Sequence, residues 1–297
     1  MLYVAGIDSG SAFTKAVIIR QRDPDHLPAV LGYASTRTGV NMDESARRAL
    51  EAAIEGARLR SGDVSYIATT GFGRYGISFR DVQITEITSG ARGAYYLHPQ
   101  PALVLDIGSQ STRAISLRDA GKVRAFKTND KCAAGSGSFI QRAAKYLQIE
   151  IDQVGELALS SENPQPISSV CAVLAESEII NLVSMGLGVE DIMRGIYDSL
   201  ADRAALLLKR VGKGERLVFI GGVATQRGMV KALEDRLKMP IVVPPQCEYV
   251  CALGAALLGL NRLQGSNQKK LAANTPTESV QPNPDSFPSP VHDVIQR

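Results

Sequence analysis

The chain has 297 residues, 44% of them hydrophobic, which is enough to bury one or two cores and excludes a mini-protein or a wholly disordered chain. Its 33 basic and 30 acidic residues give a formal charge of +3, and the scattered basic residues argue against a nucleic-acid-binding surface. Four cysteines are too few for a disulfide scaffold. With no leader or transmembrane segment expected, we predict a cytoplasmic protein that does not bind membranes.

Short β-branched runs alternate with longer helical patterns along most of the chain, which indicates an α/β fold. Strands are expected at 4–7, 16–19, 103–107, 217–220 and 241–243, and helices up to about 147, after 171, over 229–237 and over 252–259. From residue 264 the sequence is polar and contains five of the fourteen prolines. We therefore predict a first half over 1–100, a second half over 101–263 and a disordered proline-rich tail over 264–297.

A repeat divides the chain into related halves. When the sequence is shifted by 98 positions, residues 7–17 lie over residues 105–115, so that Asp, Gly, Ser, Thr and Ala coincide and Lys15 pairs with Arg113. Each copy has an apolar strand, an Asp, a Gly-Ser turn and a second strand. This pattern predicts two hairpins in two related halves, with a cleft between them.

The hairpin turns suit a polyphosphate. Glycine lets backbone N–H groups approach an anion, serine and threonine hydroxyls add donors, and the two strand-end aspartates could bind a hydrated Mg²⁺. An ordinary turn is the alternative for either hairpin alone. A Gly-Gly pair after the strand at 217–220 would let an adenine or ribose lie against the backbone. The candidate binding residues are Asp8, Ser9, Gly10, Ser11, Thr14, Lys15, Asp106, Gly108, Ser109, Gln110, Gly221 and Gly222.

The order of these motifs resembles the actin, Hsp70 and sugar-kinase superfamily. The segments 8–11, 106–108, 221–222 and 254–256 are similar to its two phosphate motifs, its adenosine motif and a connecting motif. The resemblance implies two RNase H-like domains with ATP and Mg²⁺ in the interdomain cleft. It also implies Asp106 and Gln110 as catalytic residues near the attacking water, and Asp8 at the metal through water.

Two cysteines precede helical patterns. Cys132 lies in the segment NDKCAAGSGSF and Cys171 in VCAVLAESEI. A single cysteine among small apolar residues is more often a buried side chain than a ligand. The two are 39 positions apart and lack the dense spacing of a self-contained iron–sulfur site. One chain therefore supplies too few ligands from this pair.

Both cysteine segments, with TGFGR at 70–74 and EIT at 86–88, closely resemble the BadF/BadG/BcrA/BcrD ATPase family, which contains 2-hydroxyacyl-CoA dehydratase activators and benzoyl-CoA reductase ATPase subunits. In that family two subunits share one [4Fe–4S] cluster, which implies Cys132 and Cys171 as this chain's two ligands. The resemblance further implies ATP-driven electron transfer from ferredoxin to catalytic subunits that bind an acyl-CoA. Cys247 and Cys251 match no cluster motif, and we interpret them as core thiols.

Within the family, the chain most resembles the smaller, D-type ATPase subunit of benzoyl-CoA reductase. It has DIGSQS at 106–111 and EITSGA at 86–91, where activators usually have DIGGQD and EITCHA. This resemblance implies a second, larger ATPase subunit as partner. The alternatives are a homodimeric dehydratase activator, a small-molecule kinase of the same fold, and an actin-like filament protein. A kinase would leave Cys132 and Cys171 unexplained, and an iron-containing protein would exclude both the kinase and the filament protein.

Overall fold

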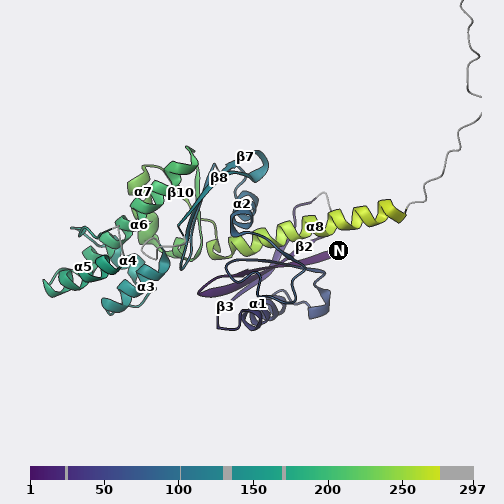
Figure 1. Cartoon of the computed structure of the whole chain (residues 1–297), viewed down its shortest axis with the longest axis horizontal. Coiled ribbons are helices and arrows are strands. Elements are labelled where there is room, and N and C mark those ends of the chain that lie inside the picture. The colour runs from purple at the N-terminus through teal and green to yellow at the C-terminus, as the bar shows by residue number, and fades with distance from the viewer. Residues whose placement is uncertain (24–25, 101, 130–135, 169–171, 275–297) are drawn as a thin grey trace, which may run out of the picture.

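The structure is a computed structural model that describes residues 1–23, 26–100, 102–129, 136–168 and 172–274. It contains two five-stranded sheets, each covered by helices, with the long helix α8 running from one to the other (Figure 1). The first-half elements are β1 (Leu2–Ser9), β2 (Phe13–Gln21), β3 (Ala29–Arg37), α1 (Met42–Gly56), η1 (Ser61–Asp63), β4 (Tyr66–Thr70), β5 (Val82–Gln83) and α2 (Glu86–Leu97). These are followed by β6 (Leu103–Ile107), β7 (Thr112–Arg118), η2 (Asp119–Gly121), β8 (Lys122–Asn129), α3 (Gly137–Tyr146), α4 (Val154–Leu159), α5 (Ala172–Ser184), α6 (Val189–Val211), β9 (Leu217–Ile220), η4 (Gly222–Thr225), α7 (Arg227–Leu237), β10 (Ile241–Val242), η5 (Cys247–Tyr249) and α8 (Val250–Asn274).

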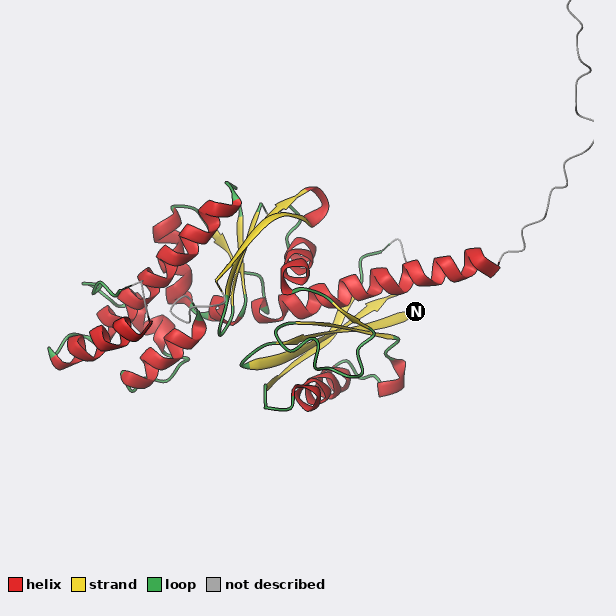
Figure 2. Ribbon diagram, viewed as in Figure 1, coloured by secondary structure: helices red, strands yellow, loops and turns green. Residues whose placement is uncertain are grey.

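The two sheets, drawn as yellow arrows in Figure 2, have the same topology. Their strand orders are β3-β2-β1-β4-β5 and β8-β7-β6-β9-β10, with the first three strands antiparallel and the last two parallel to the central strand. The hairpin registers match as well, because Asp8 lies opposite Lys15 and Asp106 lies opposite Arg113. The two related α/β halves predicted from the repeat are therefore confirmed.

Alternating burial explains how the strands pack. Val4 and Ile7 are buried on opposite faces of β1, because successive strand residues point to opposite sides and both faces of this sheet are covered. Alanines of α1 pack on one face of the first sheet. The helices α3 to α7 cover one face of the second sheet around Tyr197 and Phe219.

The two helices that follow the sheets exchange partners. Helix α2 comes after the first sheet but packs Ala91 and Ala94 against the second, whereas α8 comes after the second sheet and packs on β1, β2 and β4 of the first. Where α2 and α8 cross, a Cβ on Gly254 would collide with the Ser89 carbonyl, and one on Gly93 with the Val250 carbonyl. These contacts confirm the expected close packing of the small-residue helix between the halves.

Helix α8 differs from the predicted domain boundaries in two ways. It continues to Asn274, past the expected start of the tail at 264, and its buried residues from Ala252 to Leu260 pack on the first sheet rather than the second. The segment 264–274 is polar but contains strong helix formers, which propagate a helix that is already nucleated. The rest of the predicted tail, 275–297, lies outside the described residues. In the described ranges, no helix is both long and apolar enough to span a bilayer.

Candidate functional site

A cleft of about 740 Å³ lies between the two halves, at the turns of the β1–β2 and β6–β7 hairpins and the segments that follow β4 and β9. It brings together most of the residues predicted from the sequence. The predicted residues that line it are Asp8, Gly10, Ser11, Lys15, Asp106, Gly108, Ser109, Gln110, Gly221 and Gly222.

The two hairpin turns are closed in the same way. The Gly10 N–H donates to the Phe13 carbonyl at 3.2 Å, and the Gly108 N–H donates to the Ser111 carbonyl at 2.9 Å. The amides of these two glycines therefore hold the turns closed and do not themselves face an anion. In the described part of the chain, the amides of Ser11 and Ser109 donate to no other group, so they remain free for phosphate oxygens.

Two predicted binding residues, Ser9 and Thr14, do not reach the cleft. Ser9 is fully buried under the segment after β4, and Thr14 is fully buried with its hydroxyl 2.8 Å from that of Thr38. Each is next to a cleft residue, Asp8 or Lys15, on a strand. Since neighbouring strand residues point to opposite faces, the prediction that included both members of each pair was wrong for these side chains.

A pair of equivalent glycines supports the two aspartates. Gly71 follows β4 and Gly221 follows β9, with φ of +90° and +91°. A Cβ on Gly71 would collide with Asp8 Oδ1, and one on Gly221 would lie 2.5 Å from Asp106 Oδ1. The role of Gly71 was missed by sequence reasoning, although the repeat could have indicated it, since both glycines end a strand parallel to a hairpin strand.

The floor of the cleft favours a cation beside Asp8. Burial is the main cause that raises the pKa of Asp8, Lys15 opposes the rise, and the negative charges of Asp106 and Glu86 add to it. Among the described residues, Asp8 accepts no side-chain hydrogen bond and Lys15 forms no ion pair. A buried carboxylate without a hydrogen-bonding side chain is suited to a hydrated Mg²⁺, and an unpaired lysine beside it is suited to a phosphate.

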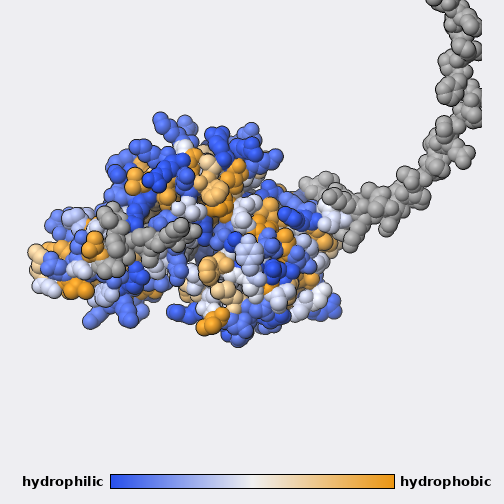
Figure 3. Space-filling model, viewed as in Figure 1, coloured by the Kyte–Doolittle hydropathy of each residue, from blue (hydrophilic) through white to orange (hydrophobic). Residues whose placement is uncertain are grey.

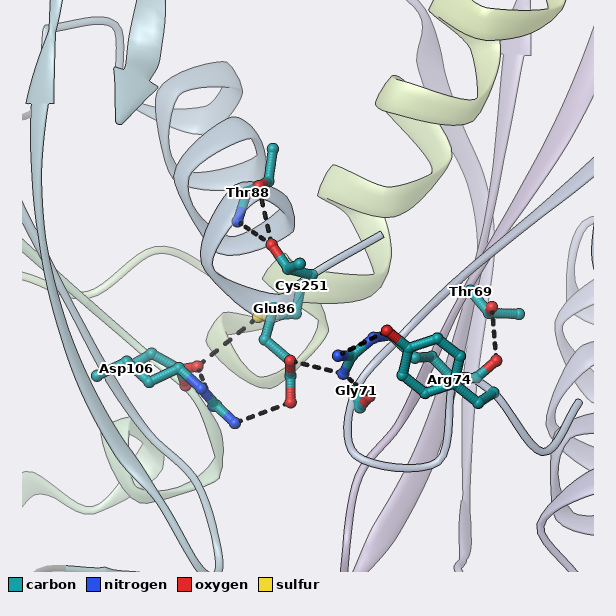
Figure 4. Close-up of polar contacts among 10 residues, drawn as sticks. Thr69, Gly71, Arg74, Glu86, Thr88, Asp106 and Cys251 are labelled. Carbon is teal, nitrogen blue, oxygen red and sulfur yellow. Dashed lines mark hydrogen bonds and ion pairs between the residues drawn. The ribbon is translucent and has the colours of Figure 1, made fainter. Parts of the chain in front are cut away.

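Asp106 belongs to a line of charged groups across the cleft floor (Figure 4). Arg113 Nη1 donates to Asp106 Oδ2 at 2.8 Å and Arg113 Nη2 to Glu86 Oε1 at 3.1 Å, while Arg74 Nη1 donates to Glu86 Oε2 at 2.9 Å. Sequence reasoning proposed no function for Arg74, Glu86 or Arg113. The coincidence of Arg113 with Lys15 in the repeat was the signal for one of them.

Cys247 and Cys251 are buried beside the cleft. Burial, followed by the charge of Glu248, raises the pKa of Cys247 to about 12. Burial, with Asp106 and Asp8, also raises the pKa of Cys251, whose thiol donates to Asp106 Oδ2 at 3.8 Å. Both thiols are therefore protonated core groups, as interpreted from the sequence, although their position under the site was not expected.

The adenosine end of the cleft is open beside the backbone. A Cβ added at Gly222 would meet no atom within 4 Å, so a flat ring could lie there. Helix α7 is fixed behind it, because the Tyr197 hydroxyl donates to Gln226 Oε1 at 2.7 Å. Arg227 and Glu156 form an exposed ion pair of 3.1 Å at the edge.

The second hairpin turn is tied to helix α3. The Gly137 and Ser138 amides donate to the Gly108 and Ser109 carbonyls at 2.9 and 2.7 Å. Helix α3 starts directly after the segment 130–135, which contains Cys132. Cys132 and Cys171, which the family resemblance predicts as cluster ligands, lie outside the described residues.

The helices that follow the two cysteines are joined to each other. Glu176 on α5 forms an ion pair with Arg142 on α3 at 2.6 Å and accepts a hydrogen bond from the Tyr146 hydroxyl at 3.2 Å. In the middle of α5, Glu178 accepts from the Ser168 amide at 2.6 Å. No three His, Cys, Asp or Glu side chains gather as metal ligands in the described ranges.

Comparison with known proteins identifies the family. Residues 5–259 match the BadF/BadG/BcrA/BcrD ATPase family. The chain is 39% identical to an activator of lactoyl-CoA dehydratase from Anaerotignum propionicum, over 89% of this chain and 99% of that protein. It is 38% identical to the D subunit of benzoyl-CoA reductase from Thauera aromatica, over 88% of this chain and 94% of that protein.

A solved structure agrees with this relationship. The activator of 2-hydroxyisocaproyl-CoA dehydratase from Clostridium difficile, determined with bound ADPNP, superposes with a TM-score of 0.83 at 33% identity. The match covers 90% of this chain and 98% of the activator. The actin-like ATPase fold expected from the motif order is thus confirmed, and the chain belongs to the BadF/BadG/BcrA/BcrD ATPase family.

Proposed function

We propose that this chain is the D-type ATPase subunit of a benzoyl-CoA reductase, which hydrolyses ATP to drive low-potential electrons towards an acyl-CoA. ATP would bind with its phosphates between the two hairpin turns and its adenosine beside Gly221 and Gly222. One contact carries the proposal: the turn at 108–109 is hydrogen-bonded to the start of α3, directly after the segment of Cys132. A movement of the turn at 108–109 on ATP binding or hydrolysis would therefore be transmitted through two backbone hydrogen bonds to the start of α3, next to the segment of Cys132.

Each of the cleft residues would have a separate role in ATP hydrolysis. Asp8 would hold Mg²⁺ through water, Lys15 would neutralise phosphate charge, and the Ser11 and Ser109 amides would bind phosphate oxygens. Gln110 would orient the water whose oxygen attacks the γ-phosphorus while the bond to the β-phosphate oxygen breaks. Asp106, held by Arg113 at 2.8 Å, would stabilise this arrangement from the floor.

Cys132 and Cys171 would each donate one thiolate to a [4Fe–4S] cluster, and the larger ATPase subunit would donate the other two. When bound, the cluster supplies one-electron transfer at low potential, with ferredoxin as the electron donor. An exposed apolar area at the α5 end of the molecule suits a subunit contact (Figure 3). Its exposed residues on and just after α5 are Leu174, Ile180, Val183 and Met185.

The sequence at the second phosphate turn supports the reductase over an activator. Ser109 and Ser111 replace a glycine and an aspartate of the usual activator motif, and the loss of a carboxylate suits a subunit specialised for a heteromer. The second candidate is a homodimeric activator of a 2-hydroxyacyl-CoA dehydratase. It is favoured by the 39% identity to the lactoyl-CoA dehydratase activator, which is as high as the 38% identity to the reductase protein.

The test is cluster assembly and acyl-CoA reduction under anaerobic conditions. The chain is purified alone and together with a larger ATPase subunit, and iron, acid-labile sulfide and the EPR signal after dithionite are measured. We expect a cluster only in the co-expressed pair, lost in Cys132→Ala and Cys171→Ala and kept in the control Cys247→Ala. Addition of ferredoxin, MgATP and the catalytic subunits should then support benzoyl-CoA reduction. A cluster in the isolated chain identifies the homodimeric activator instead, and an iron-free pair refutes electron transfer.

A further inference from the structure

Glu86 lies at the start of α2, where the chain passes from the first sheet to the second. Thr85 caps this helix by accepting from the Thr88 amide at 3.3 Å, which fixes the position of Glu86. Each oxygen of the Glu86 carboxylate accepts from a different arginine, Arg74 at 2.9 Å and Arg113 at 3.1 Å (Figure 4). Arg74 belongs to the first half and Arg113 to β7 of the second. One side chain therefore joins the two halves at the floor of the cleft.

On the first-half side, Arg74 holds the segment that supports Asp8. The same Nη1 that binds Glu86 also donates to the Gly71 carbonyl at 2.8 Å, and the Thr69 hydroxyl donates to the Arg74 carbonyl at 3.1 Å. Gly71 lies against the Asp8 carboxylate, so closely that it has no room for a side chain. Any shift of Arg74 is therefore transmitted to Asp8 through one well-packed segment.

On the second-half side, Arg113 holds Asp106 at 2.8 Å. The side chains of Arg74, Glu86 and Arg113 are only 16–17% exposed, and that of Asp106 is 6% exposed, so water screens these charges weakly. Burial lowers the pKa of Arg113, but Asp106 and Glu86 more than compensate and hold it above its ordinary value. Loss of the Glu86 charge would leave both arginines partly buried without their shared partner.

Although α2 comes from the first half of the sequence, its packing attaches Glu86 to the second sheet. Helix α2 packs Ala91 and Ala94 into the core of the second sheet, so Glu86 moves with that sheet. The contact with Arg113 therefore stays within one half, while the contact with Arg74 crosses between the halves. Opening of the cleft would break the crossing contact first.

We propose that Glu86 is a positioning residue that sets Asp8 and Asp106 relative to each other, and so couples the two phosphate-binding turns during nucleotide hydrolysis. The coupling follows the chain of contacts from Asp8 through Gly71, Arg74, Glu86 and Arg113 to Asp106. The inference rests on the proposed hydrolysis of nucleotide in this cleft, but not on the identity of the acyl-CoA. It predicts that Arg74 and Arg113 act as a unit because both bind Glu86.

The experiment is a double-mutant cycle on MgATP hydrolysis by the protein purified with its companion ATPase subunit. Arg74→Met and Arg113→Met are measured singly and together, with Glu86 present and in a Glu86→Gln background. We expect Glu86→Gln to lower kcat about tenfold while KM changes less than about threefold, since positioning acts on the reacting geometry more than on binding. With Glu86 present, the double variant should lose less than the product of the two single losses. In the Glu86→Gln background, the loss of kcat in the double variant should equal the product of the losses that Arg74→Met and Arg113→Met cause singly in that background.

A matched control breaks a similar ion pair outside the cleft. Asp198→Asn removes the negative charge that lies 2.9 Å from Arg194, whose side chain is 16% exposed, and should leave kcat unchanged. Multiplying effects of Arg74→Met and Arg113→Met with Glu86 present would overturn the inference, as would a loss of kcat in Asp198→Asn equal to that in Glu86→Gln. If Glu86→Gln does not fold, Arg74→Lys replaces it, because lysine keeps the charge but lacks the planar fork of arginine. Arg74→Lys should then lower kcat at an unchanged melting temperature, and an unchanged kcat overturns the inference.

The outcomes separate this inference from the proposed function. Coupled effects on ATP hydrolysis without any benzoyl-CoA reduction would retain the role of Glu86 and refute the reductase subunit. If the protein binds MgADPNP but hydrolyses no ATP, the proposed function fails, and the same cycle is then measured on MgADPNP affinity. Independent effects of Arg74→Met and Arg113→Met on that affinity would refute the role of Glu86 as well.

Discussion

The carboxylate of Asp8 is enclosed at the cleft floor, with Lys15 as the main opposing charge. Its pKa in the folded chain lies above the ordinary value of 3.8, chiefly because burial disfavours the charged form. The folded state therefore binds a proton before the unfolded state does as the pH falls. Ionised Asp8 destabilises the ligand-free fold at neutral pH, and this destabilisation decreases as the pH falls from the folded pKa to the ordinary value of 3.8.

Asp8→Asn should accordingly raise the melting temperature of the nucleotide-free protein at pH 7. The difference from the unaltered protein should shrink as the pH is lowered towards 4, because the unaltered side chain then becomes neutral too. The same variant should lose stabilisation by MgADPNP, since the amide cannot replace the charge that favours Mg²⁺. Thermal unfolding at several pH values, with and without MgADPNP, checks both effects. A lower melting temperature at pH 7 would contradict the account of Asp8.

Gly71 and Gly221 require both a left-handed backbone and the absence of a side chain. Gly71→Ala and Gly221→Ala should each destabilise the fold by at least about 1–2 kcal/mol and weaken nucleotide binding, because the Cβ would displace Asp8 or Asp106. Denaturant unfolding and nucleotide titration measure these changes. Gly56→Ala is the matched control, since its Cβ would meet nothing within 4 Å, and it should be neutral. Unchanged affinity in both cleft variants would disprove the supporting role.

The sequence was most informative about side chains that the repeat duplicates. Asp8 and Asp106 could be placed at a common cleft because hairpin and strand patterns are local. Ser9 and Thr14 were misplaced because a motif match does not say which face of a strand a residue occupies. The contact between Glu86 and Arg74 was not predicted, although both lie in segments that resemble the family, because it joins residues that are distant in the sequence and no spacing along the chain indicates it.

At the scale of elements, the crossing of α2 and α8 depends on close backbone approach. Gly254→Val should force the helices apart and destabilise the protein by about 1–3 kcal/mol, since overpacking at a backbone contact cannot be relieved by a rotamer change. Gly265→Ala in the same helix has open space around its Cβ and should be neutral or stabilising by up to about 1 kcal/mol. Chemical denaturation of both variants gives the comparison. Equal stability in the two would argue against tight packing at the crossing.

The elements themselves were largely predictable, because strands 4–7, 103–107 and 217–220 are apolar apart from Asp106 and lie inside β1, β6 and β9. The final turns of α8 were not predictable in this way. Residues 264–274 are mostly polar and their sequence shows no apolar stripe at helical spacing. A segment without this periodicity is not recognised as a helix from its sequence, even where, as here, it continues a helix beyond the first sheet (Figure 1).

At the scale of the whole molecule, neither sheet completes its core with its own half of the chain. Val4 and Val17 are covered by Ala256 and Leu257, and the second sheet in turn needs α2. We therefore expect one cooperative unfolding transition in calorimetry, with equal calorimetric and van't Hoff enthalpies. Two separate transitions would show that the halves are independent. A fragment of residues 1–100 should not fold alone, and circular dichroism of that fragment checks this.

The exchange of helices also dictates the timing of biosynthesis. The face of the first sheet formed by Val17 and Ile19 is covered only when Leu257 and Leu260 have been made, on the order of 240 residues later. At about 5–20 residues per second, a ribosome needs roughly 12–50 s to add that length. Throughout this interval the nascent first sheet exposes apolar strands that α8 will later cover. The N-terminal half thus reaches its native state only after most of the chain has been translated.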